Sequence, residues 1–486
     1  MSSSRWISLA LALGASCGDA GDAIDDVSLD GDADVSAVDV VVARDVPADA
    51  GDAVTDVSAR DASADVAARD VPAPQDVPRD VSAPRDVAPD APPGPVLYPA
   101  DRLHAPITPS VAAGLRAIAA RAATQPRVFA KVGASNTVNT HFVQCFGGSN
   151  VDLGTHTALR ATVDHFRMGV AGSTDPYRRV SLAATVGWSA WAAVTGSPSP
   201  LRRELDAITP RYAVVMFGTN DIQTRDIHRH GQSLLDIADQ CVARGVIPIF
   251  TSVPPRDDDA TADLWVPRFT AVVRGVAQSR QVPFIDLERA LRVLPGHGLG
   301  PDGIHMNALS SGARACALTP EGLRYGFNTR NLLTLESLDR VRRVIEGAQA
   351  PETTGETLAG EGTAARPFEV ASLPFADARD TRRSASRTID RYPGCMSAAD
   401  ESGPEFFYRL TVRESTPIRA LVLSRDGSDV DVHLLRGAAD GAQCVARNDR
   451  MITATLTPGT WLLSLDSFVS QGVERAGSYV LVVMRD

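Results

Sequence analysis

The 486-residue chain has almost no lysine: Lys131 is the only one, and the other 47 basic side chains are Arg. We attribute this imbalance to codon usage, so it gives no functional inference. The chain also has no excess of basic charge, because its formal net charge is −11. Residues 18–97 contribute −14 of this, with nineteen Asp, no Glu and five Arg, which leaves about +3 for the rest. A nearly neutral folded part offers no electrostatic footprint for nucleic acid.

Residues 18–97 also contain no aromatic side chain. The segment repeats Asp-Val, Asp-Ala and Arg-Asp-Val-Pro. Such a composition buries too little apolar surface to offset the entropy of ordering, so we expect a disordered, self-repelling linker. It is either a tether that holds a folded part away from an anchor or a low-complexity insertion whose length has no role.

The apolar run at residues 6–13 is too short to span a membrane. It follows Arg5 and precedes small residues, which is the layout of an export signal over residues 1–17. The stretch that ends at Cys17 also resembles a bacterial lipoprotein processing site, in which Cys17 would be lipidated. An ordinary secretory signal is the alternative. In either case we expect an exported protein, anchored at the cell surface or outer membrane by its lipid or else secreted.

Cysteine is scarce, with six in the chain. In an oxidising compartment Cys395 and Cys444, which share the C-terminal region, are the expected disulfide. Of Cys145, Cys241 and Cys316 at most two can pair with each other, and the sequence does not say which two.

From Tyr98 onward, patterns typical of buried strands alternate with patterns typical of helices. This alternation predicts βαβ units and a parallel sheet covered on both faces, in which ligands bind at the carboxyl ends of the strands. The expected strands are 127–132, 179–185, 212–217, 246–251 and 282–287, and the expected helices are 110–123, 231–244, 261–279 and 332–348.

Four motifs follow the expected strands and therefore fall on one rim of the sheet. They are Gly133–Asn136, Gly187, Gly218–Asp221 and Asp302–His305. Taken together they contain the side chains and backbone groups that acyl transfer requires. Taken singly, each has an ordinary structural explanation.

Ser135 is the candidate nucleophile, because a serine hydroxyl beside a base can attack a carbonyl carbon. His305 is the candidate base, and Asp302, three residues earlier, can fix its tautomer and orientation. The alternative for Ser135 is capping of a helix expected at residues 136–145.

The candidate oxyanion donors are the backbone N–H groups of Ser135 and Gly187 and the side-chain amide of Asn220. The alternatives are a turn glycine at Gly187 and helix capping by Asn220 and Asp221. None of His141, His228, His230 and His297 combines a carboxylate at comparable spacing with a position at a strand end, so we interpret them as surface or packing residues. We do not interpret His228 and His230 as metal ligands.

Residues 98–348 resemble the SGNH (GDSL-like) hydrolases, whose four sequence blocks are matched by Ser135, Gly187, Asn220 and His305. Asp302 matches the third member of the family's triad. The resemblance implies a flavodoxin-like three-layer α/β/α fold, no metal or other cofactor, and hydrolysis of esters. One departure is Ala134, where the family usually carries Asp; since that Asp is outside the triad, we expect activity to be retained.

Residues 349–366 form a second linker, and residues 367–486 contain short runs of alternating residues separated by turns. This pattern predicts an antiparallel β-sandwich. Its motifs at 427–434 and 477–481 are similar to the pre-peptidase C-terminal domains of secreted hydrolases, which implies a role in secretion or polymer binding. Asp429 and Asp431 are interpreted as turn and strand-edge residues rather than calcium ligands. The expected strands are 406–412, 418–423, 430–435, 452–456, 461–465 and 479–483.

The combined hypothesis is an exported, lipid-anchored serine esterase that acts on an ester substrate, with acetyl or acyl groups on a polysaccharide preferred. Two alternatives remain open. One is a cell-surface binding or adhesion protein on a hydrolase fold that no longer turns over, and the other is an acyltransferase that uses the same residues.

Overall fold

The computed structural model describes residues 95–352 and 355–486. The expected export signal, Cys17 and residues 18–94 of the first linker lie outside the described residues. Val96, which the sequence analysis assigns to this linker, is buried, and its N–H donates to Gln281 Oε1 at 2.9 Å. In the described residues, no helix has the length and apolar character needed to cross a bilayer.

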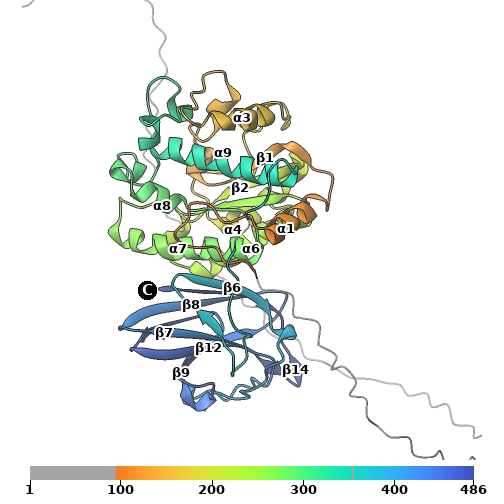
Figure 1. The fold of residues 1–486 in the computed structure, drawn as a ribbon, viewed down its shortest axis with the longest axis vertical. Coiled ribbons are helices and arrows are strands. Elements are labelled where there is room, and N and C mark those ends of the chain that lie inside the picture. The colour runs from red at the N-terminus through yellow and green to blue at the C-terminus, as the bar shows by residue number, and fades with distance from the viewer. Residues whose placement is uncertain (1–94, 353–354) are drawn as a thin grey trace, which may run out of the picture. The chain divides into compact units, whose positions relative to one another are not determined.

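The first half of the described chain is built on a four-stranded parallel sheet in the order β1-β2-β3-β4. Helices α1 and α9 cover one face of this sheet, and α6 and α7 cover the other (Figure 1). The three-layer α/β/α fold expected from the sequence is confirmed. The strands are β1 Gln125–Gly133, β2 Pro210–Met216, β3 Ile247–Thr251 and β4 Phe284–Ile285, and the helices are α1 Pro109–Ala119, α2 Ser135–Val138, α3 Arg160–Arg167, α4 Ala190–Val194, α5 Pro200–Ile208, α6 Ile227–Ala243, α7 Ala260–Ser279, α8 Leu287–Arg292 and α9 Gly326–Ile345.

Local sequence explains these elements. Every residue of β3 is buried, as expected for a strand covered on both faces, and its sequence is almost wholly apolar. Helix α1 begins after Thr108, whose hydroxyl accepts from the N–H of Val111, and it buries Val111, Leu115 and Ile118 on one face. These elements fix where the carboxyl ends of the strands meet.

Two expected elements are wrong. Residues 179–185 form no strand, because their backbone N–H groups bind side chains: Leu182 donates to Glu204 Oε2 at 2.9 Å and Ala183 to Ser181 Oγ at 3.0 Å. Only an isolated bridge joins Ala184 to Gly133. The helix expected at 136–145 stops at Val138, because the next residue, Asn139, leaves helical geometry and its side chain accepts from the N–H of His141.

The C-terminal part is a β-sandwich of two sheets, β10-β9-β12-β7-β5 and β11-β8-β15-β6. All pairings are antiparallel except that of β5 with β7. The antiparallel sandwich is confirmed, but it has more strands than expected, since β5, β6, β10 and the β13-β14 pair are short or carry charged residues. The strands are β5 Phe368–Val370, β6 Phe375–Asp380, β7 Phe406–Val412, β8 Thr416–Ser424, β9 Val430–Arg436, β10 Cys444–Asn448, β11 Met451–Leu456, β12 Gly459–Ser467, β13 Val469–Ser470, β14 Val473–Glu474 and β15 Ser478–Arg485.

Strand β15 is buried on both faces. Leu481 and Val483 belong to the core between the two sheets, whereas Val480 and Val482 belong to the hydrophobic cluster of the α/β part. Gly275 of α7 makes room for Val482, because a Cβ at this glycine would lie 2.7 Å from the valine side chain. Successive residues of β15 therefore pack alternately into the core of the sandwich and into the hydrophobic cluster of the α/β part.

Two disulfides are present. Cys395 pairs with Cys444, as the sequence predicts, and Cys145 pairs with Cys316 across 171 residues. Cys241 is the free cysteine among the described residues and is buried in α6.

Candidate active site

Ser135, His305 and Asp302 lie in one chain of hydrogen bonds. The hydroxyl of Ser135 is 2.9 Å from Nε2 of His305, and Nδ1 of the same ring is 2.6 Å from Oδ2 of Asp302. Ser135 directly follows β1, whereas the other two residues lie in a turn 170 positions later in the sequence. The fold thus brings a hydroxyl, an imidazole and a carboxylate into the order needed for nucleophilic chemistry.

The Asp302 carboxylate is held in its charged form. Burial opposes ionisation, but the His305 ring and the backbone N–H groups of His305 and Ile304 donate to this carboxylate and together lower the pKa of Asp302 to about 2. One oxygen accepts the two backbone N–H groups at 3.0 and 3.1 Å, which leaves the other for the ring. The backbone of the turn therefore orients the carboxylate independently of its hydrogen bond to the His305 ring.

The position of Ser135 depends on the tight end of β1. A Cβ at Gly133 would lie 2.4 Å from Thr137 Oγ1 and 2.6 Å from the carbonyl oxygen of Met216, so only glycine fits there. Ser135 is the first residue of α2, and Ala134 occupies the cap position without a side-chain hydrogen bond. The alternative of a helix-capping serine is therefore wrong, and the hydroxyl is directed at His305.

The turn that carries His305 is fixed from the opposite side by the loop after β3. Gly303 has φ +65°, and a Cβ there would lie 2.6 Å from the backbone nitrogen of Asp258. Arg256 holds this loop, because its guanidinium pairs with Asp258 at 2.6 Å and donates to the carbonyl of Thr219 at 2.7 Å. Arg256 thus joins the loop after β2 to the loop after β3, and the second of these loops packs against the turn that carries His305.

Sequence reasoning missed the groups that join the two halves of the site. Asn136 accepts from the N–H of Met306 at 3.2 Å, directly beside the Ser135 to His305 contact. Arg330 of α9, which is 1% exposed, donates to the carbonyl of Asn136 at 2.7 Å. Burial lowers the pKa of Arg330 to about 9. Arg330 carried no sequence signal, because it acts on a backbone carbonyl, whereas the position of Asn136 beside Ser135 was a usable hint.

The remaining two predicted site residues lie in neighbouring loops. Asn220 donates from Nδ2 to the carbonyl of Trp188 at 2.9 Å, and this contact joins its loop to the turn that contains Gly187. Gly187 has φ +79° and is exposed. Within the described part of the chain, no hydrogen bond links either residue to Ser135.

Asn220 occupies the N-cap position of the short 3-10 helix Asp221–Gln223, but its side chain makes no capping hydrogen bond there, and the cap of α6 is Asp226. The capping alternative for the side chains of Asn220 and Asp221 is therefore wrong. The carboxylate of Asp221 instead accepts from the N–H of Ala190 at 3.0 Å and lies 3.0 Å from Nδ1 of His230. His230 is 1% exposed and is therefore a packing residue.

One group of potential metal ligands occurs among the described residues, in the sandwich. Glu401, Asp431 and His433 are buried, with their ligand atoms within 4.8 Å of one another. Arg447 pairs with Glu401 at 3.1 Å and also contacts the Asp431 carboxylate. The guanidinium already supplies the positive charge that this pair of carboxylates requires.

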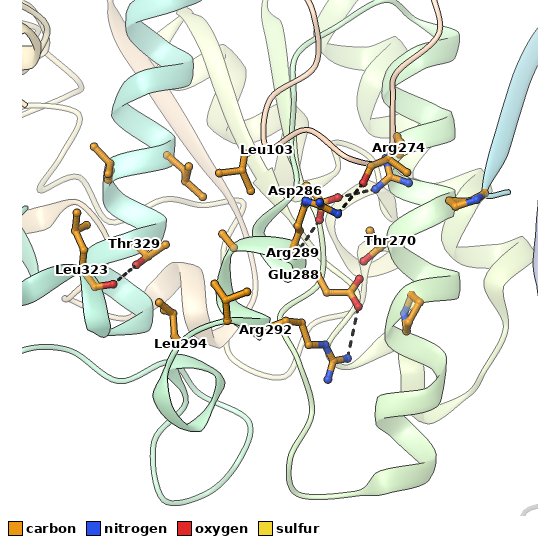
Figure 2. A pocket seen from close by; sticks show the side chains of 17 residues that line it. Leu103, Thr270, Arg274, Asp286, Glu288, Arg289, Arg292, Leu294, Leu323 and Thr329 are labelled. Atoms are coloured by element: carbon orange, nitrogen blue, oxygen red, sulfur yellow. Dashed lines mark hydrogen bonds and ion pairs between the residues drawn. The ribbon is translucent and has the colours of Figure 1, made fainter. Parts of the chain in front are cut away.

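A cavity of about 800 Å³ lies among α7, α8 and α9, and none of the predicted site residues lines it. Figure 2 shows leucines on one side, including Leu103 and Leu294, and a polar wall on the other. In that wall Arg274 pairs with Asp286 at 2.6 Å. This cavity is separate from the Ser135 site.

Residues 145–310 match the model of the GDSL-like Lipase/Acylhydrolase family. The chain contains a GDSL-like lipase/acylhydrolase domain. The resemblance seen in the sequence is thereby confirmed, and the domain is of a hydrolase family. The match begins ten residues after Ser135, so the assignment of this serine depends on its geometry rather than on the match. No curated protein matches the chain.

Three solved structures illustrate the likeness. A GDSL-like lipase from Bacteroides thetaiotaomicron is 15% identical and covers 47% of this chain and 98% of its own, with a TM-score of 0.29. A catalytic mutant of an acetylxylan esterase from Geobacillus stearothermophilus is 13% identical and covers 44% and 95%, with a TM-score of 0.30. The pre-peptidase C-terminal domain of a collagenase from Bacillus anthracis is 16% identical and covers 23% and 89%, with a TM-score of 0.16.

Proposed function

We propose that this GDSL-like domain is a serine ester hydrolase with Ser135, His305 and Asp302 as its catalytic triad. The carrying observation is the continuous hydrogen-bonded chain from the Ser135 hydroxyl through the His305 ring to the Asp302 carboxylate. The hydroxyl makes no helix cap, and the imidazole has one nitrogen on the carboxylate and the other on the serine. That arrangement is the one a nucleophilic serine requires.

In the proposed reaction, Ser135 Oγ attacks the carbonyl carbon of the ester while His305 Nε2 takes the hydroxyl proton. The tetrahedral intermediate collapses as His305 returns this proton to the departing alcohol, which leaves an acyl-serine. Water then attacks the acyl-serine with His305 again as the base. His305 returns this proton to Ser135 Oγ as the second tetrahedral intermediate collapses and the carboxylic acid departs. The negative charge of Asp302 stabilises the imidazolium in both halves of the reaction.

The oxyanion that forms in each half needs donors aimed at it. We assign this role to the backbone N–H groups of Ser135 and Gly187 and to the Asn220 amide. Asn220 uses one N–H on Trp188, and its second N–H is left for the substrate oxygen. The same hydrogen bond holds Asn220 beside the turn of Gly187, which supports a shared role for the two residues.

We further propose that the enzyme is exported, with Cys17 as a lipid anchor. The disulfides Cys145–Cys316 and Cys395–Cys444 support an oxidising compartment, and the sequence pattern that ends at Cys17 supports the anchor. A cell-surface enzyme with an appended sandwich suits a polymeric substrate, such as an acylated polysaccharide. The proposed domain limits are 98–348 for the hydrolase and 367–486 for the sandwich.

The test is hydrolysis of 4-nitrophenyl acetate by wild type, Ser135→Ala and His305→Ala. We expect either substitution to lower kcat by at least about 10³-fold, because the nucleophile or its base is lost. Ser149→Ala is the matched serine control, since Ser149 is exposed in a loop. His297→Ala is the matched histidine control, since His297 also binds an aspartate, Asp257, at 2.8 Å but contacts no serine among the described residues.

Equal and negligible rates for wild type and Ser135→Ala would contradict the proposal and favour a binding protein on a hydrolase fold. Activity in Ser135→Ala close to that of wild type would assign the nucleophile to another residue. Transfer of the acetyl group to an added sugar, measured by product analysis, would show the acyltransferase alternative with the same residues.

A further inference from the structure

A small cavity lies beside α2, the helix that begins with the proposed nucleophile Ser135. Its volume is about 110 Å³, and it is lined by Thr137 and Val138 of α2 and by Ala184, which bridges to Gly133 at the end of β1. Val138 is three residues after Ser135, a rise of about 4.5 Å along the helix. Pockets for whole drug-sized ligands measure about 300–1,000 Å³, so this cavity has room for a single functional group of a ligand.

The lining of this cavity contains three cationic side chains and no carboxylate. Lys131, Arg178 and Arg179 all contribute to it, together with the polar side chains of Asn139 and Gln144. The amide groups of this lining can donate hydrogen bonds to oxygen atoms of a ligand. The three cationic side chains favour a ligand with negative charge.

The two arginines are neutralised from behind the cavity. Arg179 forms two hydrogen bonds with Glu204, at 2.8 and 2.9 Å, and Arg178 pairs with Asp175 at 3.0 Å. These pairs orient the guanidinium groups and leave little net charge at either of them.

Lys131 is the cation that has no such partner. Its ammonium donates to the carbonyl oxygen of Tyr177 at 2.9 Å, and in the described part of the chain no carboxylate lies within 4.0 Å of it. The residue is only 9% exposed. A buried ammonium with a neutral partner costs free energy unless an anion completes its hydrogen bonds. We drew no functional inference from Lys131 in the sequence, but the structure places this single lysine of the chain in the lining of the cavity.

We propose that this cavity binds a carboxylate group of the substrate, with Lys131 as the residue that pairs with it, so that the enzyme prefers esters bearing a free carboxylate. One unmatched positive charge suits one negative charge, as in a carboxylate, better than the higher charge of a phosphate. The inference rests on the proposed function, because it concerns the substrate of the Ser135 site.

The protonation of Lys131 provides a second measure of the pairing. Burial lowers the pKa of Lys131 to about 8, the negative charges of Glu204 and Asp175 oppose this shift, and the positive charges of Arg330 and Arg179 add to it. The ammonium is therefore present below about pH 8 and is lost as the pH rises through this value. A preference for charged esters that depends on Lys131 is therefore expected to weaken as the pH rises through about 8. The preference is measured as the ratio of kcat/KM for the charged and the neutral ester, so that the effect of His305, which acts on both esters, cancels.

The experiment compares two pairs of esters, each differing by one carboxylate. Mono-4-nitrophenyl succinate and 4-nitrophenyl butyrate place the charge on the acyl side, because their acyl chains have equal length and end in a carboxylate or a methyl group. Acetylated galacturonic acid and acetylated galactose place it on the alcohol side. We expect wild type to favour the charged member of at least one pair by about 10- to 100-fold in kcat/KM, as a charged hydrogen bond contributes about 1.5–3 kcal/mol.

Lys131→Met is expected to remove this preference and to change kcat/KM for the neutral esters less than about threefold. Arg202→Met is the control for net charge, because Arg202 lies exposed on α5. The proposal is overturned when wild type shows no preference in either pair, or when Lys131→Met keeps the preference or lowers the charged and neutral rates equally. If Lys131→Met does not fold, the wild-type preference and its loss above about pH 8 decide the question.

Failure of the proposed function is a different result. Wild type that hydrolyses no ester contradicts the esterase, whereas titration with galacturonate and galactose still tests the cavity. Binding of galacturonate that is lost in Lys131→Met supports the cavity, and equal binding of the two sugars overturns it.

Discussion

At the scale of single residues, the hydrogen bond between Asp302 and His305 decides which ring nitrogen faces Ser135. The Asp302 carboxylate can only accept, so the neutral ring that donates to it carries its proton on Nδ1, and Nε2 can take a proton from the serine hydroxyl. An amide at position 302 can present an N–H to the ring instead, which favours the wrong tautomer. This part of the proposed mechanism depends on the charge of Asp302 rather than on its size.

Asp302→Asn is therefore expected to lower kcat by on the order of 10³–10⁴-fold with little change in KM, measured with 4-nitrophenyl acetate. Asp257→Asn is the matched control, because Asp257 also binds a histidine, His297, at 2.8 Å. Equal effects of the two substitutions would mean that Asp302 has only a structural role.

The pKa of Asp302 also gives a prediction for the activity of the enzyme at acidic pH. The pKa of Asp302 is lowered to about 2, mainly by hydrogen bonds that outweigh the effect of burial. The stabilising effect of the charged form is present above the ordinary value of 3.8 and is lost as the pH falls toward 2. Loss of activity near pH 5 is thus expected to reflect another group, and a profile in which Asp302→Asn removes an inflection near pH 4 would contradict this.

The residues of the proposed triad could be predicted because their residue types occur in short motifs with a recognisable spacing. Asp302 and His305 are three positions apart, and Ser135 follows a strand, so spacing and strand order suffice. Arg330 and Lys131 could not be predicted in this way. Each of them donates to the backbone carbonyl of a residue far away in the sequence. Every residue type has such a carbonyl, so the sequence does not indicate which one accepts.

At the scale of elements, the errors have the same origin. Long elements such as α7 and β2 follow from apolar periodicity and were predicted within a few residues. The stretch 179–185 was expected to be a strand, but the N–H groups of Leu182 and Ala183 bind the side chains of Glu204 and Ser181, and only the end of the stretch pairs with β1, at Gly133. Local side-chain acceptors compete with regular structure, and their geometry is set only by the folded chain.

The turn at Gly303 gives a prediction for this scale. Gly303→Ala adds a Cβ that would lie 2.6 Å from the Asp258 nitrogen, so the turn must move and carry His305 with it. A displacement of about 1 Å costs about 10² in rate, and we expect this loss in kcat with 4-nitrophenyl acetate. Gly312→Ala is the matched control, because Gly312 also has a positive φ, +56°, but no atom within 4 Å of its added Cβ.

The control separates two causes. Both substitutions place alanine in a left-handed conformation, which costs about 1 kcal/mol of stability. Only the first one pushes on the loop behind the site. Similar losses of kcat in the two variants would show that backbone strain, and not the contact with Asp258, is responsible.

At the scale of the whole molecule, the α/β part and the sandwich share apolar surface. Val482 on β15 packs at Gly275 of α7, and the outer face of β15 belongs to the hydrophobic cluster of the α/β part. Gln278 of the same helix donates to the carbonyl of Ala376 at 2.6 Å. Because neither part buries this surface alone, we expect the described region to unfold in one cooperative transition.

Val482→Asp tests this coupling. The substitution buries a carboxylate against α7 without a partner cation, and we expect a loss of about 3 kcal/mol or more in stability, or a melt that divides into two transitions. Val445→Asp is the control, because Val445 is 52% exposed on β10 and its substitution should change stability by about 0.5 kcal/mol or less. Calorimetry measures both variants. Two transitions in wild type, neither of them shifted by Val482→Asp, would show that the sandwich is attached by its chain and not by its packing, and the C-terminal part would then be free to bind a polymer independently of the enzyme.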